Sequence, residues 1–310
     1  MITVRYDPSL IERAVWLAAR RDVGAERDLH NAIDPIFELP QGDDREALFQ
    51  EAFVRWFKHL KLDQFIDEML MHFPHIVGQV KLGVVRPASR RKSEGAELFV
   101  RDDSGAPGRT LVLQVCPESL VATETIRDTM LRELQHVEDM LDASFDYVPE
   151  SIEGLPPRQQ VVRDRYRVLW DIRVEAALAR RGLLVHTDKV RLERQFVHAF
   201  TIGGARPELG LFDGVWKREH VPHPQLLAWA KDARAWVGNG AQQQVGAPAT
   251  TPGESCAVCG FPTFDWYTPA DELHEAVRRS IRQARPDWSP PDGICRQCAE
   301  TFISEAALRT

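Results

Sequence analysis

The sequence predicts a mostly helical α+β fold that ends in a small cysteine-rich module. Between residues 8 and 236, most stretches place apolar side chains at the helical period of about 3.6. One pair of short β-like stretches interrupts this pattern, at 97–100 and 111–115. Two C-x-x-C pairs follow residue 254, after a stretch rich in glycine, proline, alanine, threonine and glutamine. Together these observations predict helical regions, one β-hairpin and a separate metal-binding module.

A helical N-terminal region is expected over residues 1–77. The stretch 43–60 has apolar side chains at positions 48, 49, 53, 54, 57 and 60, close to the helical period. A second helix is expected over 61–73, and Pro74 ends it because proline lacks the backbone N–H that a helix interior requires. The sequence therefore predicts packed helices before the first strand.

The central body is expected over residues 78–236. The stretches 97–100 and 111–115 are predicted to pair as a hairpin through a polar turn that contains Gly105 and Gly108. Helices are expected after the hairpin, over 119–141, 157–181, 189–200 and 224–236. The predicted order is therefore a β-hairpin, two long helices and two shorter ones.

A linker is expected over 237–254 and a cysteine module over 255–310. The linker has few large apolar side chains, so it is expected to contribute little to a core. Helices are expected over 269–284, in the spacer between the two cysteine pairs, and over 299–307, after the second pair. A first pair in a turn and a second pair on a helix resemble treble-clef and zinc-ribbon modules.

The module's four cysteines form two C-x-x-C pairs, Cys256 with Cys259 and Cys295 with Cys298. A C-x-x-C turn lets two thiolates reach one ion, and two such pairs complete the tetrahedral four-sulfur shell typical of structural zinc. A filled shell has no open position for substrate, so the zinc is expected to be structural rather than catalytic. Two other interpretations stay open: buried cysteines without a ligand, and a redox C-x-x-C pair. Cys116 stands apart and is interpreted as a buried core cysteine.

The predicted helix over 119–141 contains a second motif around Glu133 and His136. In the H-E-x-x-H motif of zinc metallopeptidases, two histidines one turn apart bind zinc, and the glutamate activates the metal-bound water. Glu133 and His136 occupy the positions of the glutamate and the second histidine, and Arg132 occupies that of the first. An arginine side chain stays protonated and cannot ligate zinc.

This stretch, with the hairpin before it and the long helix after it, resembles the core of gluzincin-type metallopeptidases. With the cysteine module it also resembles SprT-like proteins in outline, over residues 95–182 and the C-terminal tail. The resemblance implies a zincin-like core, Glu133 as catalytic base, and His136 and Glu175 as metal ligands, with Asp171 as the alternative carboxylate. Because Arg132 departs from the family's motif, a second metal site is expected to be weak and the peptidase inactive or impaired.

Three interpretations of this helix stay open. In the first, Arg132 fills the position of the metal and pairs with Glu133, Asp171 or Glu175, so that the fold persists without the chemistry. In the second, the core is an active zinc-dependent hydrolase. In the third, Glu133 lies on the surface, His136 lies at the edge of the core, and the motif arose by chance. A non-enzymatic adaptor, whose zinc module binds a protein or nucleic-acid partner, is the alternative function.

Composition narrows the expected location and partners. The formal net charge is −7 and the sequence pI is about 5.8, which disfavours non-specific nucleic-acid binding without excluding a local basic patch. A protein partner or a peptide substrate is compatible with this charge. Charges interrupt every apolar run near the N-terminus, and no run approaches the length of a membrane span. Cysteines arranged for metal binding suit a reducing compartment, so a cytoplasmic location is predicted. The sequence does not indicate an oligomeric state.

Overall fold

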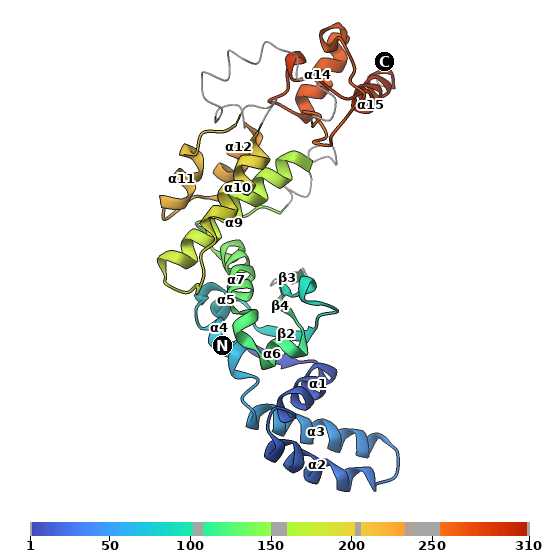
Figure 1. The fold of residues 1–310 in the computed structure, drawn as a ribbon, viewed down its shortest axis with the longest axis vertical. Coiled ribbons are helices and arrows are strands. Elements are labelled where there is room, and N and C mark those ends of the chain that lie inside the picture. The colour runs from blue at the N-terminus through green and yellow to red at the C-terminus, as the bar shows by residue number, and fades with distance from the viewer. Residues whose placement is uncertain are drawn as a thin grey trace. The chain divides into compact units, whose positions relative to one another are not determined.

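A computed structural model describes residues 2–101, 108–149, 160–201, 206–232, 236 and 255–308. The expected linker over 237–254 and the predicted turn residue Gly105 lie outside this part of the chain. The described residues are mostly helical and include a four-stranded sheet, which confirms the predicted α+β class (Figure 1). The chain divides into two compact units: unit 1 is Met1–Asp142 with Arg181–His186, and unit 2 is Ala143–Arg180 with Thr187–Thr310.

Unit 1 begins with a strand and five helices, and continues with three strands, a short helix and a long helix. The first group is β1 (Thr3–Tyr6), α1 (Pro8–Ala19), α2 (Val23–Phe37), α3 (Asp43–His59), α4 (Gln64–Leu70) and α5 (Pro74–Gln79). The second group is β2 (Leu82–Pro87), the 3-10 turn η1 (Arg91–Ser93), β3 (Gly95–Arg101), β4 (Gly108–Val115), α6 (Pro117–Val121), the 3-10 turn η2 (Thr123–Thr125) and α7 (Arg127–Leu141).

The sheet of unit 1 has the strand order β1-β2-β4-β3. Strands β1, β2 and β4 run parallel, and β3 pairs antiparallel with β4 at one edge. The β3–β4 pair confirms the predicted hairpin strands. Strands β1 and β2 were not predicted, because β1 is only four residues long and β2 contains Gly83 and ends at Pro87, two residue types disfavoured in strands.

Helices of unit 1 pack on both the sheet and one another. Helix α1 packs against α2, α3 and α6, and helix α7 packs against the edge strand β3 and against α5. The helix predicted over 119–141 is interrupted, because η2 separates α6 from α7. There the Thr125 hydroxyl donates to the Ala122 carbonyl at 2.9 Å, a local bond that competes with the helical ladder.

Unit 2 is built around the long helix α9 (Gln160–Arg180), which packs against α10 (Lys189–Phe200), α11 (Gly210–Lys217) and α12 (His223–Lys231). The cysteine module follows, with the 3-10 turn η5 (Ala270–Glu272), α14 (Glu275–Ala284), the 3-10 turn η6 (Pro290–Asp292) and α15 (Arg296–Ala307). The helix predicted over 269–284 is thus a short turn followed by α14, and the helix predicted over 299–307 begins at Arg296. No helix in the described part of the chain is long and apolar enough to cross a membrane.

Candidate metal centre

The first cysteine pair lies in a tight turn that depends on a glycine. Gly260 has a φ of +78°, in the left-handed region that glycine tolerates best. Its N–H donates to the Cys256 carbonyl at 2.8 Å, and the Cys256 N–H donates to the Phe261 carbonyl at 2.9 Å. A Cβ on Gly260 would lie 3.2 Å from Val161 Cγ2 of α9, so close packing also opposes a larger residue. The glycine after Cys259 therefore shapes the turn and lets it approach α9.

The second cysteine pair opens helix α15. Cys295 is the N-cap residue, and its Sγ accepts a hydrogen bond from the Cys298 N–H at 3.4 Å. The positive end of a helix stabilises a nearby thiolate. Upstream, the Tyr267 N–H donates to the Ile294 carbonyl at 2.9 Å, and Trp266 forms an isolated antiparallel bridge with Cys295. These bonds fix how the chain enters the helix and therefore where both sulfurs point.

The two pairs converge on one point. The four Sγ atoms all lie within 4.8 Å of one another, and those of Cys259 and Cys295 are 3.9 Å apart. Sulfurs bound tetrahedrally to zinc at about 2.3 Å lie about 3.8 Å from one another. The Cys256 Sγ also accepts hydrogen bonds from the Val258 N–H at 3.4 Å and the Cys295 N–H at 3.3 Å. The spacing and the N–H donors both fit a four-thiolate metal site.

The thiols interact strongly with one another. Hydrogen bonds from Cys259 and then Cys298 lower the pKa of Cys256 well below the ordinary value of a thiol. The hydrogen bond to Cys256 raises the pKa of Cys259, and bonds to Cys256 and Cys259 raise the pKa of Cys298. One thiolate is therefore stabilised by neighbours that keep their protons. A divalent cation would replace those protons, so metal binding at this site is expected to release them.

A small apolar core supports the cysteines. Cys256 and Cys295 are buried, together with apolar side chains from the first cysteine turn, from α14 and α15 and from the segments before each helix, namely Val258, Leu273, Val277, Ile281, Trp288, Ile294 and Phe302. The Trp288 indole N–H donates to the Gly293 carbonyl at 3.0 Å, so its buried polar atom is satisfied. The core is too small to be very stable alone, which is where a bound ion contributes most.

A buried ion pair connects the module to helix α9. Arg165 Nη1 lies 3.0 Å from Asp287 Oδ2, and the two side chains are 1% and 3% exposed. Arg165 Nε also donates to the Ala199 carbonyl of α10 at 2.9 Å. On the module side, Arg285 Nη1 lies 3.2 Å from Asp287 Oδ1, and Arg285 Nε donates to the Ala257 carbonyl at 2.9 Å. Polar contacts thus run from α10 through α9 to the residue between the first two cysteines.

Sequence reasoning missed the Arg165–Asp287 pair. The two residues are 122 positions apart, and neither belongs to a motif. Burial lowers the pKa of Arg165, and the charge of Asp287 opposes that shift. A fully buried arginine in α9 gives no sequence signal of its own, because arginines on amphipathic helices are usually exposed.

Helix α7 places the residues of the second motif against the edge strand. A Cβ on Gly95 of β3 would lie 3.5 Å from Glu133 Oε2, so the Glu133 carboxylate lies beside this strand. His136 is half-buried. Arg132 Nη2 donates to the His186 carbonyl at 3.2 Å. Arg132 is thus held against the Arg181–His186 segment of unit 1, and its predicted pairing with Glu133, Asp171 or Glu175 stays a prediction.

Other carboxylates of α7 bind backbone amides. Glu138 is buried and accepts from the His75 and Ile76 N–H groups, each at 2.9 Å, at the start of α5. Asp128 accepts from the N–H groups of Val185 at 3.2 Å and of His186 at 3.1 Å. These carboxylates hold neighbouring segments in place.

The remaining predicted site residues lie in or near helix α9 of unit 2. Glu175 is 1% exposed and accepts from the Asp188 N–H at 3.1 Å, just before α10. Asp171 lies one turn earlier in α9. Outside the motifs, Cys116 is buried as expected, and burial followed by the nearby Glu94 raises its pKa to about 11. Such a thiol stays protonated and poorly reactive.

In the described residues, one group of three or more histidine, cysteine, aspartate or glutamate side chains lies close enough to hold a metal ion, and it is the four cysteines. The roles of His136 and Glu175 as ligands and of Glu133 as base stay predictions, as does the cytoplasmic location. Comparisons with protein-family models, with curated proteins and with solved structures found no match for this chain.

Proposed function

We propose that this chain is a zinc-binding protein in which the zinc is structural. The observation that carries the proposal is the convergence of Cys256, Cys259, Cys295 and Cys298 within 4.8 Å. Four thiolates fill a tetrahedral shell and favour zinc over harder cations such as calcium and magnesium. The ion would hold the two cysteine segments together and so stabilise the module that Arg165 and Asp287 attach to α9.

Zinc per chain, measured by elemental analysis on metal-loaded protein, tests this proposal. Wild type is expected to hold one zinc, and the Cys256→Ser/Cys259→Ser variant close to none. Cys116→Ser is the matched control, because it removes a buried thiol outside the cluster, and it is expected to keep one zinc. Equal zinc content in wild type and the double variant would contradict the proposal. Two zinc ions in wild type and one in the double variant would indicate a second site in the body.

For the body of unit 1, we propose a metallopeptidase-like core that lacks catalytic zinc. The proposal is supported by the order of elements, in which an antiparallel edge strand precedes the helix that carries Glu133 and His136. It is also supported by the position of Glu133 beside β3, the strand along which an extended peptide would pair. Arg132 stands where the first metal-binding histidine of the motif would be, and arginine cannot replace it as a ligand.

Restoring the missing histidine at position 132 tests the proposal of a metallopeptidase-like core. Arg132→His is expected to raise the zinc content from one to two per chain, because it completes the pair of histidines one helical turn apart. Arg132→Gln also removes the charge but adds no strong ligand, so it serves as the control and is expected to stay at one. If Arg132→His also stays at one zinc, α7 does not retain a peptidase-type site, and the core proposal fails while the structural zinc proposal stands.

The alternative, a non-enzymatic adaptor, is favoured by two exposed aromatic side chains beside the first cysteine pair. Phe261 is 73% exposed and Phe264 is 79% exposed. Exposed aromatics are enriched at protein interfaces, and the net charge of −7 favours a protein over nucleic acid. Phe261→Ser/Phe264→Ser is expected to lose partners that cross-linking recovers with wild type. Identical cross-linked partners for both proteins would exclude this surface.

A further inference from the structure

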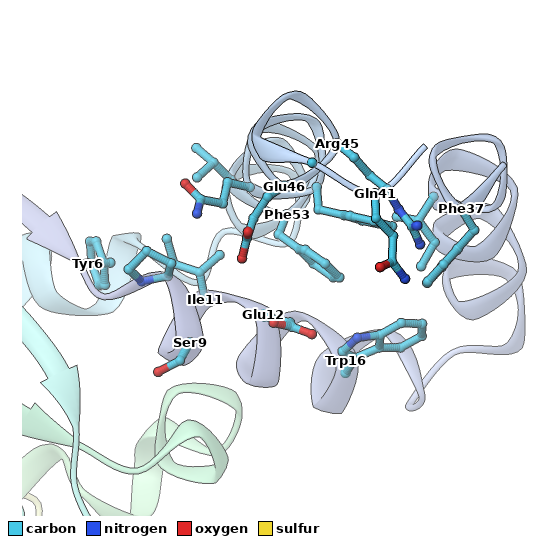
Figure 2. A pocket seen from close by; sticks show the side chains of 16 residues that line it. Tyr6, Ser9, Ile11, Glu12, Trp16, Phe37, Gln41, Arg45, Glu46 and Phe53 are labelled. Carbon is cyan, nitrogen blue, oxygen red and sulfur yellow. The ribbon is translucent and has the colours of Figure 1, made fainter. Parts of the chain in front are cut away.

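Unit 1 contains a cavity that the proposed function does not use. It lies between helix α1 and the antiparallel pair α2–α3, and its volume is about 700 Å³ (Figure 2). Cavities of about 300–1,000 Å³ are typical of small-molecule sites. All of its lining residues belong to Tyr6–Val54, so one compact unit builds the whole cavity.

Aromatic side chains form much of the cavity wall. Trp16 of α1 lies 6.1 Å from Phe53 of α3, measured between ring centroids. Phe37 at the end of α2 meets Phe49 of α3 edge to face at 4.8 Å. Phe37 is 56% exposed although it lines the cavity, so part of its ring is open to solvent. Exposed aromatic surface that lines a cavity is typical of a binding site rather than of a close-packed hydrophobic core.

Two of these rings, Phe37 and Phe49, already contact a cation of the chain itself, the Arg45 side chain. The Arg45 guanidinium lies 5.5 Å from the centroid of Phe37 and 5.6 Å from that of Phe49, within the range of a cation–π interaction. Arg45 Nη1 is also 3.4 Å from the Leu39 carbonyl. Arg45 is therefore held at one end of the cavity, where Figure 2 places it near Phe37 and Gln41.

Two carboxylates lie on opposite sides of the same cavity. Glu12 comes from α1 and Glu46 from α3, and Figure 2 shows the Glu46 carboxylate directed from α3 towards α1. Among the described residues, neither carboxylate has a hydrogen-bond or ion-pair partner. With Arg45 held by aromatic rings, the lining keeps two available negative charges and one engaged positive charge. Aromatic walls with available carboxylates complement a positively charged ligand.

We propose that this cavity binds a small organic cation: a primary to quaternary amine carried on an apolar or aromatic body. The body would pack against Trp16 and Phe53, and the ammonium would lie near Glu12 and Glu46. Both carboxylates are exposed, so a neutral ligand would gain no ion pair from them, and an anion would be repelled by them. The proposal does not depend on zinc, because the cavity and the cysteine module lie in different units.

Isothermal titration calorimetry on the full chain tests the proposal with three probes of similar shape. At pH 7, 2-phenylethylamine is a cation, 2-phenylethanol is neutral, and 3-phenylpropionate is an anion. The amine is expected to bind at least about fivefold more tightly than the alcohol, because the two exposed carboxylates each contribute a weak ion pair. The anion is expected to bind most weakly.

Glu12→Gln/Glu46→Gln is expected to bring the affinity for the amine down to that for the alcohol, while the alcohol's own affinity stays unchanged. Glu51→Gln is the matched control, since Glu51 is an exposed carboxylate on α3 that does not line the cavity, and it is expected to bind the amine as wild type does. The proposal is overturned if the amine and the alcohol bind equally, if the anion binds best, or if none of the probes binds. It is also overturned if the double variant keeps the preference for the amine.

Discussion

In the cysteine module four thiols point at one another, whereas in helix α7 two carboxylates, those of Asp128 and Glu138, accept hydrogen bonds from backbone amides of neighbouring segments. The module brings two short turns together, and each turn has already placed two sulfurs. Helix α7 carries several acids, but Glu138 binds the start of α5 and Asp128 binds Val185 and His186. Carboxylates can bind metal, but these two of helix α7 instead accept hydrogen bonds that hold neighbouring segments.

The difference follows from how many contacts must form before a site exists. Each C-x-x-C turn is local, so a single long-range contact, between the two turns, completes a four-ligand shell. The ExxH pattern supplies one ligand and one base, and a metal site also needs ligands from elsewhere in the chain. Helix periodicity alone places acids near one another on a face, where capping a neighbouring helix is an equally good use of a carboxylate.

The largest expected effect comes from breaking the sulfur shell. Cys298→Ser is expected to lose nearly all bound zinc and to unfold the module, because structural zinc contributes about 10–16 kcal/mol of binding free energy in small zinc modules. Hydrogen exchange over residues 255–308 measures the unfolding, and elemental analysis measures the zinc. A variant that kept both its zinc and its slowly exchanging amides would show that the thiols do not hold the ion.

A smaller effect is expected where the module meets helix α9. Arg165→Met leaves Asp287 buried with one charge partner fewer, and breaking a buried ion pair costs about 3–5 kcal/mol of unfolding free energy. Urea unfolding measures the loss, and the zinc content is expected to stay at one per chain. Arg167→Met, an exposed arginine on the same helix, is the control and should change stability by less than about 0.5 kcal/mol. Equal stability of the two variants would mean that the pair contributes nothing.

In helix α7, Glu138→Ala removes the carboxylate that holds the start of α5. The two amides of His75 and Ile76 then lose their acceptor, and about 2–3 kcal/mol of unfolding free energy is expected to be lost. Glu138→Gln keeps an uncharged acceptor and should lose less, and the exposed Glu68→Ala should lose almost nothing. A zinc content that falls with Glu138→Ala would instead show that this acid acts in a metal site.

The smallest expected effect is the one that separates the two regions most sharply. His136→Ala is expected to leave zinc at one per chain, because the proposed site uses the four cysteines alone. Elemental analysis checks this, with Cys298→Ser as the positive control for loss. A fall in zinc content in His136→Ala would establish a metal in α7 despite Arg132, and the two regions would then no longer differ in kind.

The sequence predicted those parts of the structure that depend on short-range pattern. The α+β class, the β3–β4 pair and the four cysteines all follow from spacing within a few residues of one another. Strands β1 and β2 escaped prediction because parallel pairing is specified by distant partners, and four residues show too little alternation. For the same reason, the sequence did not predict the partners of Arg165 or the cavity beside Trp16. Both are formed by elements that only the folded chain brings together.

The segment Arg181–His186 completes unit 1 only after part of unit 2 has been synthesised. Unit 1 is interrupted after Asp142 by a stretch that belongs to unit 2, and is completed only when this short segment arrives. Until then Asp128 lacks its two amide donors, and Gln135 lacks the Arg181 guanidinium that donates to it at 3.1 Å. A ribosome adds roughly 5–20 residues per second. A nascent chain therefore spends several seconds with an unfinished first unit, during which chaperones and proteases can reach helix α7.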